Sequence, residues 1–273
     1  MHQPRKRFGQ HFLHDPGVIG RIVAAIAPEP HHRMVEIGPG LGALTVPLLA
    51  RLDKLHAIEI DRDAIGHLRE LTGNDPRLLI HSADVLDFSL RDIYESEAPA
   101  SGADRALRLV GNLPYNISTP LLFHLIEQRE CIRDMHFMLQ KEVVDRMAAA
   151  PGSEHYGRLT VMLAPWVSVE PLFDIGPGAF RPPPKVISTV VRLRPHQTPM
   201  DVGEPRHFAA VVSAAFSQRR KTLRNALKPL LAAEEIAAAG IDPGLRAEVL
   251  SPADFIALGR QLTPRPTPPA GSL

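Results

Sequence analysis

The chain has little cysteine and no long apolar run. Its 273 residues include a single cysteine, Cys131, so no disulfide can form within the chain. We expect Cys131 to be a small core residue of a protein in the reducing cytoplasm. No apolar run approaches the roughly 20 residues that a membrane-spanning helix needs. The basic start, MHQPRKRFGQHF, has no apolar segment behind it, so we expect neither a secretory signal nor a membrane partner.

The charge is nearly balanced overall but unevenly distributed. A net charge of +1 conceals three basic clusters that contain no acidic residue. They are Arg5, Lys6 and Arg7; Arg181, Lys185, Arg192 and Arg194; and Arg219, Arg220, Lys221, Arg224 and Lys228. Each cluster alone is consistent with a solvated face. Together they favour a surface that binds the phosphates of a nucleic acid.

Apolar periodicity predicts alternating strands and helices in the first two thirds of the chain. Strands are expected over 34–37, 55–60, 78–80, 107–110 and 135–139, and helices over 15–27, 41–52, 64–71, 119–128 and 142–149. A short helix over 159–164 precedes two further strands, 166–173 and 186–193, which are joined by a proline-stiffened connection, 176–185, that cannot be helical. The pattern predicts an α/β fold whose mostly parallel sheet carries an antiparallel edge hairpin.

Only helical patterns follow the sheet, over 208–216, 223–231, 233–239 and 253–262. We therefore expect a catalytic domain over 1–196 that begins with a flexible basic arm, 1–14, and then a linker over 197–206. A small helical domain over 207–262, in contact with RNA, and a disordered tail over 263–273 complete the prediction.

A short motif at the end of the fourth strand supplies the strongest chemical signal. The Asn112 side-chain oxygen and the Leu113 carbonyl can each accept a hydrogen bond, and Pro114 restricts the residue before it to an extended backbone. Tyr115 adds a flat face for stacking. Two acceptors beside an aromatic plate suit the amino group of a planar base, although four residues alone also fit an ordinary strand end with a proline turn.

A glycine-rich turn, Gly38-Pro39-Gly40-Leu41-Gly42, lies where the first strand meets the following helix. Glycines there let the backbone approach a ligand at the carboxyl end of a parallel strand. Glu59 ends the next strand 19 residues after Gly40, where a carboxylate can accept hydrogen bonds from both ribose hydroxyls. The pattern indicates a nucleoside cofactor.

The acids around this turn favour S-adenosylmethionine over NAD. The spacing is G-x-G-x-G rather than the G-x-G-x-x-G that binds a pyrophosphate. Glu36 would repel a diphosphate but not a sulfonium and an ammonium. Asp84, after the third strand, is placed to accept from an adenine amino group. Each acid alone could instead be an N-cap or a surface carboxylate.

Eight ordered blocks between Lys6 and Ser251 resemble the ribosomal RNA adenine dimethyltransferases. They are KRFGQHFL, VEIGPGLGALT, IEID, GNLPYNISTP, FMLQKEV, YGRL, FRPPPKV and QRRKTLRNAL. The resemblance implies a Rossmann-like methyltransferase fold and S-adenosylmethionine as cofactor. It also implies N6,N6-dimethylation of two adjacent adenosines in the 3′-terminal hairpin loop of small-subunit (16S) ribosomal RNA, in ribosome biogenesis. The expected partner is this RNA or the immature 30S subunit, met by a monomer.

The resemblance also implies the roles of individual residues. Cofactor contacts would fall on His11, Leu13, Gly38, Gly40, Glu59, Asp84 and Asn112. His11 departs from the family, whose first block commonly has Asn at this position, so a backbone contact is expected there rather than a side-chain contact. We expect Tyr115 and Phe180 to stack on the target adenine, although Phe180 is equally consistent with a core residue.

Basic residues in all three clusters are expected to bind RNA, and no metal site is expected. The RNA-binding candidates are Arg5, Lys6, Arg7, Arg181, Lys185, Arg219, Arg220, Lys221 and Arg224. The adjacent histidines His31 and His32 lack further ligands in the sequence and are interpreted as a solvated turn.

Three alternatives stay open at this point. The nearest is a macrolide-resistance methyltransferase of the same family, which acts on large-subunit RNA; the match through the C-terminal helices argues against it. An NAD-dependent oxidoreductase is disfavoured by the glycine spacing and by the lack of a catalytic Tyr-Lys or His pair. A non-catalytic RNA-binding or assembly factor is distinguished from an enzyme only by the intact motif from Asn112 to Tyr115.

Overall fold

The computed structural model describes residues 11–96, 106–114, 117–218 and 220–262. These residues form two compact units. The first contains the described residues up to Asp145 together with Val167–Gln197, and the second contains Arg146–Trp166 together with those from Thr198 onwards. Among the described helices, none is long and apolar enough to cross a membrane.

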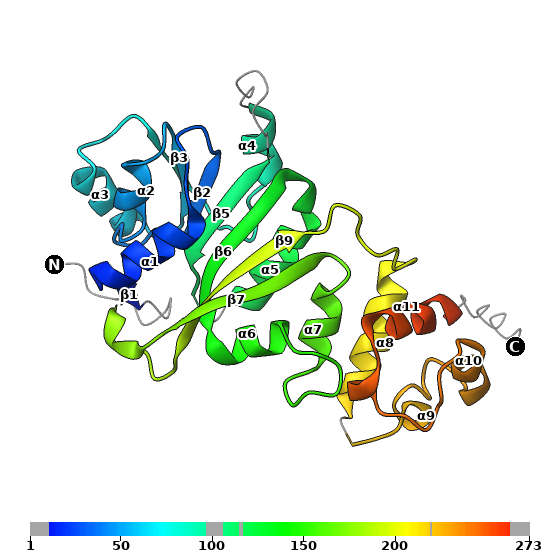
Figure 1. Ribbon diagram of the computed structural model, residues 1–273. Helices are drawn as coiled ribbons and strands as arrows, with labels where there is room; N and C mark the ends of the chain where they lie inside the picture. The colour runs from blue at the N-terminus through cyan, green and yellow to red at the C-terminus, as the bar shows by residue number, and fades with distance from the viewer. Residues whose placement is uncertain (1–10, 97–105, 115–116, 219, 263–273) are drawn as a thin grey trace, which may run out of the picture. The chain divides into compact units, whose positions relative to one another are not determined.

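The first unit is built on a seven-stranded sheet with the order β4-β3-β2-β5-β6-β9-β7 (Figure 1). The strands are β2 (Met34–Ile37), β3 (Leu55–Glu59), β4 (Leu78–Ser82), β5 (Leu107–Asn112), β6 (Ile132–Gln140), β7 (Val167–Ile175) and β9 (Ser188–Pro195). Strands β4 through β6 are parallel, whereas β9 is antiparallel to both β6 and β7. The chain order reverses between β2 and β5. Such a switch point is where open α/β sheets bind their ligands.

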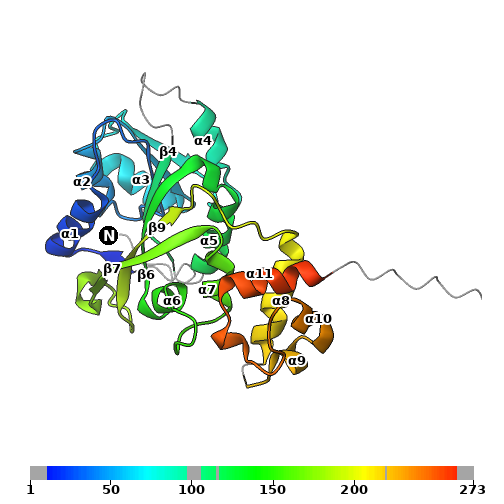
Figure 2. The same ribbon diagram turned by 45° about the vertical axis from the view of Figure 1, so that its right-hand side comes forward.

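Helices flank the sheet on both sides (Figure 2). They are α1 (Pro16–Ile26), α2 (Thr45–Leu49), α3 (Arg62–Leu71), α4 (Leu90–Ser96), α5 (Ser118–Glu127), the 3₁₀ turns η2 (Arg129–Cys131) and η3 (Pro177–Ala179), and α6 (Lys141–Met147), which ends in the second unit. Helix α1 begins as its sequence predicts: Asp15 accepts the Val18 N–H at 2.9 Å, and Pro16 occupies the first turn. Its apolar side, with Ile22, Val23 and Ile26, packs in the core against the sheet.

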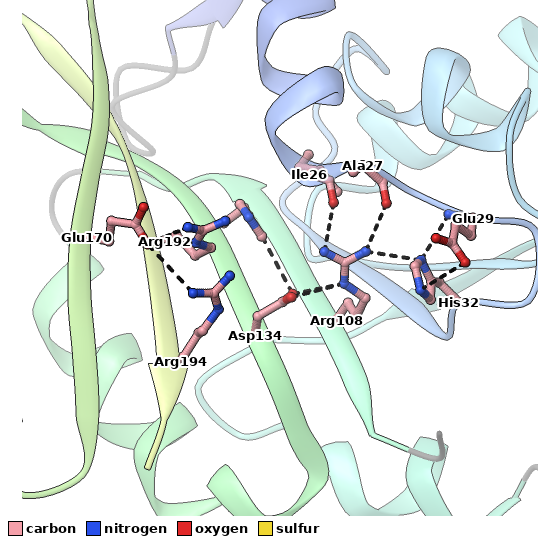
Figure 3. A network of polar contacts seen from close by, with 10 residues as sticks. Ile26, Ala27, Glu29, His32, Arg108, Asp134, Glu170, Arg192 and Arg194 are labelled. Atoms are coloured by element: carbon pink, nitrogen blue, oxygen red, sulfur yellow. Dashed lines mark hydrogen bonds and ion pairs between the residues drawn. The ribbon is translucent and has the colours of Figure 1, made fainter. Parts of the chain in front are cut away.

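A buried polar network ties the end of α1 to the sheet (Figure 3). The Arg108 guanidinium on β5 donates to the carbonyls of Ile26 at 2.7 Å and Ala27 at 3.2 Å, which the helix leaves without internal partners. It also donates to Asp134 on β6 at 3.0 Å. Burial raises the pKa of Asp134, but His136 and Arg108 outweigh that effect and lower it to about 2. The ion pair therefore persists through the ordinary pH range.

A second sheet of two short strands lies beside the main one. Strand β1 (Phe12–Leu13) pairs antiparallel with β8 (Phe180–Arg181), with Leu13 opposite Phe180 and Phe12 opposite Arg181. The His14 N–H extends the pairing by donating to the Ala179 carbonyl at 2.9 Å. Residues 11–14 are called the amino-terminal strap below.

The second unit is helical. It contains α7 (Arg158–Leu163), α8 (Pro205–Ser217), α9 (Leu223–Ala226), α10 (Ala233–Ala238), the 3₁₀ turn η4 (Ala247–Val249) and α11 (Pro252–Gln261). Helices α8 and α11 cross closely at Gly259, where an added Cβ would lie 3.2 Å from the backbone N and Cα of Phe208. Ser251 and Asp254 cap α11 reciprocally, each accepting the other's backbone N–H.

The structure confirms the predicted α/β sheet, its antiparallel edge and the helical C-terminal part. It changes the assignment of residues 146–166, which the sequence placed with the sheet. Tyr156 is buried in the core of the second unit, and its hydroxyl donates to the Leu250 carbonyl at 2.6 Å. The Gly152 N–H donates to the Glu248 carbonyl at 2.7 Å. These long-range contacts leave no periodic signal in the sequence.

Several predicted elements differ in extent. The helix expected over 41–52 is reduced to α2, because Gly40 (φ 54°) and Gly42 (φ 83°) take positive φ values in the preceding turn. The helix expected over 223–231 ends after one turn as α9. The connection 176–185, expected to be wholly non-helical, contains the 3₁₀ turn η3 and strand β8. Helix α4 and the two strands of the small sheet were not predicted, and β1 lies within the range expected to be a flexible arm.

Candidate active site

A cavity of about 140 Å³ lies at the carboxyl ends of β2, β3 and β5, where the chain order of the sheet reverses. The strap closes one side of it, and the glycine turn and the start of α3 form other parts of its wall. It is lined by His11, Phe12, Leu13, Glu36, Gly38, Pro39, Gly40, Leu41, Ala43, Leu44, Glu59, Ile60, Asp61, Asn112, Leu113, Pro114 and Ile117. The cofactor-binding and catalytic motifs of the sequence therefore share one cavity.

Gly40 shows why the turn needs glycine. Its φ of 54° disfavours larger residues, and an added Cβ would lie 3.3 Å from the ring of Phe12 in the strap. The Gly40 N–H donates to the Glu59 carboxylate at 3.2 Å, so the turn is held against the end of β3. Because Gly40 has no side chain, Phe12 of the strap can pack close to the glycine turn.

Glu59 is fixed by backbone groups. Its carboxylate also accepts the N–H groups of Ile60 and Asp61, both at 2.9 Å. Burial raises the pKa of Glu59, and the three backbone hydrogen bonds oppose that rise. The side chain is 7% exposed and lines the cavity, which suits a carboxylate that accepts from ribose hydroxyls.

Glu36 is the most deeply buried acid in the site. It is 2% exposed, and Thr45 Oγ1 donates to its carboxylate at 2.6 Å. Burial raises its pKa to about 7; the Thr45 hydrogen bond opposes the rise and the charge of Glu59 adds to it. Within the described residues, no hydrogen bond or ion pair joins Glu36 to a basic side chain. A ligand with positive charge would supply the countercharge that the wall lacks.

Asp61 adds an acceptor that the sequence analysis overlooked. Its Oδ1 caps α3 by accepting the Asp63 N–H at 3.0 Å, while Oδ2 is buried without a hydrogen-bond partner among the described residues. A buried acceptor of this kind in a cavity wall calls for a ligand donor or a water. The position of an Asp directly before an apolar-periodic helix was the available signal. The acids and the glycine turn together fit a cationic nucleoside cofactor.

The predicted target-base motif, which begins Asn112-Leu113-Pro114, starts at the last residue of β5 beside the same turn. Asn112 Nδ2 donates to the carbonyl of His11 in the strap at 2.9 Å, and the Leu113 N–H donates to the Met138 carbonyl at 3.3 Å. Gly111, just before the motif, has its Cα so close to β2 that an added Cβ would lie 2.5 Å from the Ile37 carbonyl oxygen. The motif is thus packed directly against the strand that leads into the glycine turn.

The His11 ring contacts the proline-rich segment after β8. Its Nδ1 lies 2.8 Å from the Pro182 carbonyl oxygen and donates to it. The backbone of His11, in contrast, faces Asn112. The backbone contact to the cofactor that is expected at this position stays a prediction, while the structure shows that the His11 carbonyl contacts Asn112.

Most of the predicted cofactor and catalytic residues line the cavity, and among the described ones Asp84 and Phe180 do not. His11, Leu13, Gly38, Gly40, Glu59, Asn112 and Leu113 all lie in its wall. Asp84 is half-buried and is not among the residues that line the cavity. Its Oδ1 accepts the Leu86 N–H at 2.9 Å. Phe180 is only 2% exposed and packs in the hydrophobic core, so it presents no free face to a base; here the core interpretation holds. Tyr115 lies outside the described residues.

The predicted RNA-binding residues lie in both units. Arg181 and Lys185 are exposed beside the small sheet, and Arg220, Lys221 and Arg224 are exposed around the start of α9. Arg5, Lys6, Arg7 and Arg219 lie outside the described residues. The second basic cluster is partly neutralised, because Arg192 donates to Glu170 and Arg194 lies 3.7 Å from the same carboxylate (Figure 3).

One group in the described part of the chain has the composition of a metal site: Glu29, His31 and His32. Nδ1 of His32 accepts from the Glu29 N–H at 2.9 Å and from Arg108 at 3.0 Å. A neutral imidazole with Nδ1 as acceptor carries its proton on Nε2, so that nitrogen has no lone pair for a metal. The group is better explained as the turn that follows α1.

The doubly wound sheet, its antiparallel last strands, and a glycine turn ringed by acids define the class: this is a methyltransferase that uses S-adenosylmethionine. Residues 1–263 match the ribosomal RNA adenine dimethylase family. The chain belongs to this family.

Named relatives agree with that assignment. The chain is 57% identical to the ribosomal RNA small subunit methyltransferase A of Methylococcus capsulatus, over 96% of this chain and 99% of that protein. It is 52% identical to the protein of the same name from Pseudomonas aeruginosa, over 97% of each.

Solved structures share the fold. A dimethyladenosine transferase from Plasmodium falciparum superposes with a TM-score of 0.75 and 25% identity, covering 91% of this chain and 96% of that one. The 23S rRNA methyltransferase ErmE superposes with a TM-score of 0.67 and 25% identity, covering 92% and 99%.

Proposed function

We propose that this enzyme transfers methyl groups from S-adenosylmethionine to N6 of two adjacent adenosines in the 3′-terminal hairpin loop of small-subunit ribosomal RNA. Each adenosine receives two methyl groups. The observation that carries the proposal is that Asn112 and Leu113 line the same cavity as Glu36 and Glu59. One opening thus presents acceptors for an amine next to a pocket suited to a cationic nucleoside. The relatives named above support the small subunit as the source of the RNA.

Four predicted cofactor residues have distinct tasks in this proposal. Within the cavity, Glu59 accepts from the ribose hydroxyls, and the backbone at Gly38 and Gly40 lies against the cofactor. Asp84, which is not part of the cavity lining, accepts from the adenine amino group of the cofactor. Glu36 supplies negative charge to the positively charged part of the cofactor. When bound, S-adenosylmethionine would supply an electrophilic methyl group: the N–C bond to N6 forms as the C–S bond breaks, and the thioether is the leaving group.

Asn112 and Leu113 activate the amine by hydrogen bonding. The N6 lone pair is delocalised into the purine ring, which makes the amine a weak nucleophile. Acceptance of the N6–H groups by Asn112 Oδ1 and the Leu113 carbonyl favours a tetrahedral nitrogen with its lone pair directed at the methyl group. Neither group is a strong base, so the surplus proton leaves to water after transfer. The main contribution of the protein is positioning.

The target base must leave its stack to reach the cavity, so an unpaired loop is the natural substrate. Tyr115 would stack on the base, and the exposed basic residues of both units would bind the RNA backbone. We propose that the enzyme works as a monomer in the cytoplasm on the immature 30S subunit. Stacking on Phe180 would require the small sheet to open, and the proposal does not depend on it.

The test uses small-subunit particles that lack the modification. Purified enzyme and labelled S-adenosylmethionine are added, and the modified nucleosides are mapped by nuclease digestion and mass spectrometry. We expect N6,N6-dimethyladenosine at two neighbouring positions near the 3′ end. A parallel reaction is given unmodified large-subunit particles, and label in that RNA with none in the small-subunit RNA would instead assign the enzyme to the other branch of its family. The Asn112→Ala variant, which keeps the cofactor pocket, should bind cofactor and lose most transfer.

A further inference from the structure

We propose that the main-chain carbonyl of His11 positions the catalytic amide: it accepts the Asn112 Nδ2–H and so holds Asn112 Oδ1 toward the incoming adenine amine. The two atoms are 2.9 Å apart, and both residues line the cavity. The inference rests on the proposed function and adds a positioning role for a backbone group of the strap.

The need for such a group follows from the shape of a carboxamide. Its oxygen and nitrogen ends are nearly equal in size, so packing alone hardly distinguishes the two orientations. Only the orientation with Oδ1 toward the amine can accept N6–H, because the reverse would place two donor groups against each other. A carbonyl oxygen offers lone pairs alone, and it therefore selects the orientation with Nδ2 toward the strap.

The strap is firmly held, as this task requires. Strand β1 pairs with β8, the His14 N–H donates to Ala179, and Leu13 is 6% exposed in the core. The His11 ring donates to the Pro182 carbonyl at 2.8 Å. The bond to Asn112 uses a backbone oxygen, so its formation does not depend on which side chain occupies position 11. This explains how histidine can stand where an Asn is common.

Asn112→Asp separates the two functions of the amide. An ionised carboxylate is a stronger acceptor for N6–H but cannot donate to the His11 carbonyl and is repelled by it. We expect kcat to fall about 10- to 100-fold at pH 8, with cofactor affinity preserved within a few-fold. If accepting a hydrogen bond from N6–H were the only role of Asn112, the kcat of the variant would equal or exceed that of the wild type.

The pH profile of this variant provides the decisive readout. A protonated carboxyl has a donor and an acceptor, like the amide, and restores the bond to His11. The groups that share the cavity with position 112 are Glu36, Glu59, Asp61 and His11. The three acids and burial hold the introduced carboxyl protonated to higher pH than usual. The ratio of variant to wild-type kcat should therefore rise on acidification, by up to about tenfold per pH unit.

Two controls make the outcomes distinct. Asn74→Asp places the same change on an exposed turn after α3, and its ratio to wild type should stay near one at every pH. A pH-independent ratio for Asn112→Asp, with an active wild type, would overturn the positioning role alone. A wild type that transfers nothing to adenosine would overturn the proposed function.

The bond can also be observed without turnover. The chain has four asparagines, Asn74, Asn112, Asn116 and Asn225, so selective ¹⁵N labelling gives a simple side-chain amide spectrum. We expect one Asn112 amide proton, assigned by its loss in Asn112→Asp, to exchange with water more slowly than those of Asn74. Equal exchange rates in the folded wild type would contradict the inference whatever the kinetics show.

Discussion

At the scale of single residues, the site depends on acids held without countercharge. Glu36 illustrates the cost, since a buried carboxylate favours its neutral form unless a cation approaches. The electrostatics of the pocket therefore favour a positively charged ligand. The same residue links the stability of the protein to pH.

Glu36→Gln should stabilise the enzyme at alkaline pH in the absence of cofactor. The pKa of Glu36 rises from 4.5 to about 7 on folding, so the stability that its neutral form contributes is complete below pH 4.5 and is lost as pH rises through about 7. The loss amounts to roughly 3 kcal/mol by pH 8. In thermal unfolding, the melting temperature should decrease less between pH 5 and pH 8 for the variant than for the wild type. Glu130→Gln, an exposed control, should behave as wild type.

Glu59→Ala should remove cofactor binding and leave the chain folded. The substitution deletes the ribose acceptor and leaves the N–H groups of Gly40, Ile60 and Asp61 to water. We expect calorimetry to detect no binding of S-adenosylmethionine at concentrations that saturate the wild type, and circular dichroism to show an intact fold. Normal affinity in this variant would refute the ribose assignment.

At the scale of elements, the important contacts join segments that are distant in the sequence. The end of β5 approaches β2 so closely at Gly111 that no side chain fits. The strap reaches Asn112 across 101 positions of the sequence. The geometry of the site thus depends on strand packing as much as on its motifs.

Gly111→Ala should damage both stability and catalysis. The added methyl would lie 2.5 Å from the Ile37 carbonyl oxygen, so β5 and β2 must separate. We expect a loss of about 1–3 kcal/mol in the free energy of unfolding and a lower kcat. Gly20→Ala is the matched control: nothing lies within 4 Å of its added Cβ in α1, and the helix should be stabilised slightly. Equal behaviour of the two variants in urea unfolding would contradict the close approach.

The sequence predicted the elements that have a strong apolar pattern, and it missed the short strands that form only because they pair with each other. Apolar runs of β-branched and aliphatic residues located all five parallel strands. Strands β1 and β8 are two residues long, too short for any period, and exist because each pairs with the other. Phe180 illustrates the same limit, since an aromatic residue before a proline run could face a base or the core, and only its partner Leu13 decides. Asp61 was missed because an Asp before a helix is ordinarily an N-cap, and the sequence does not show that its second oxygen is left without a partner in the cavity wall.

At the scale of the molecule, charge distribution matters more than net charge. A chain with a net charge of +1 carries exposed basic residues around the start of α9 and beside the small sheet. The boundary between the two units shows the limit of prediction at this scale. Residues 146–166 are joined to the second unit by hydrogen bonds to positions about a hundred residues later, which local composition does not reveal.

The salt dependence of RNA binding should identify the helical unit as part of the interface. Replacement of Arg220, Lys221 and Arg224 by Ala should weaken binding and reduce the slope of log affinity against log salt by about 0.7–0.9 for each lost phosphate contact. Arg260→Ala removes a cation that is already paired with Asp201 and should leave the slope unchanged. Filter binding over a salt series would measure both. An unchanged slope in the triple variant would exclude this cluster from phosphate binding.

The Arg108 network has a mechanical consequence for the target-base motif. Arg108 fastens the last carbonyls of α1 near the first residue of β5, and the strap before α1 grips Asn112 at the last residue of the same strand. The segment from 11 to 27 is therefore attached by hydrogen bonds to the same strand, β5, at both of its ends. Loosening one attachment should therefore disturb the other, so loss of the Arg108 guanidinium near the amino end of the central strand β5 should also displace the Asn112 amide at its carboxyl end.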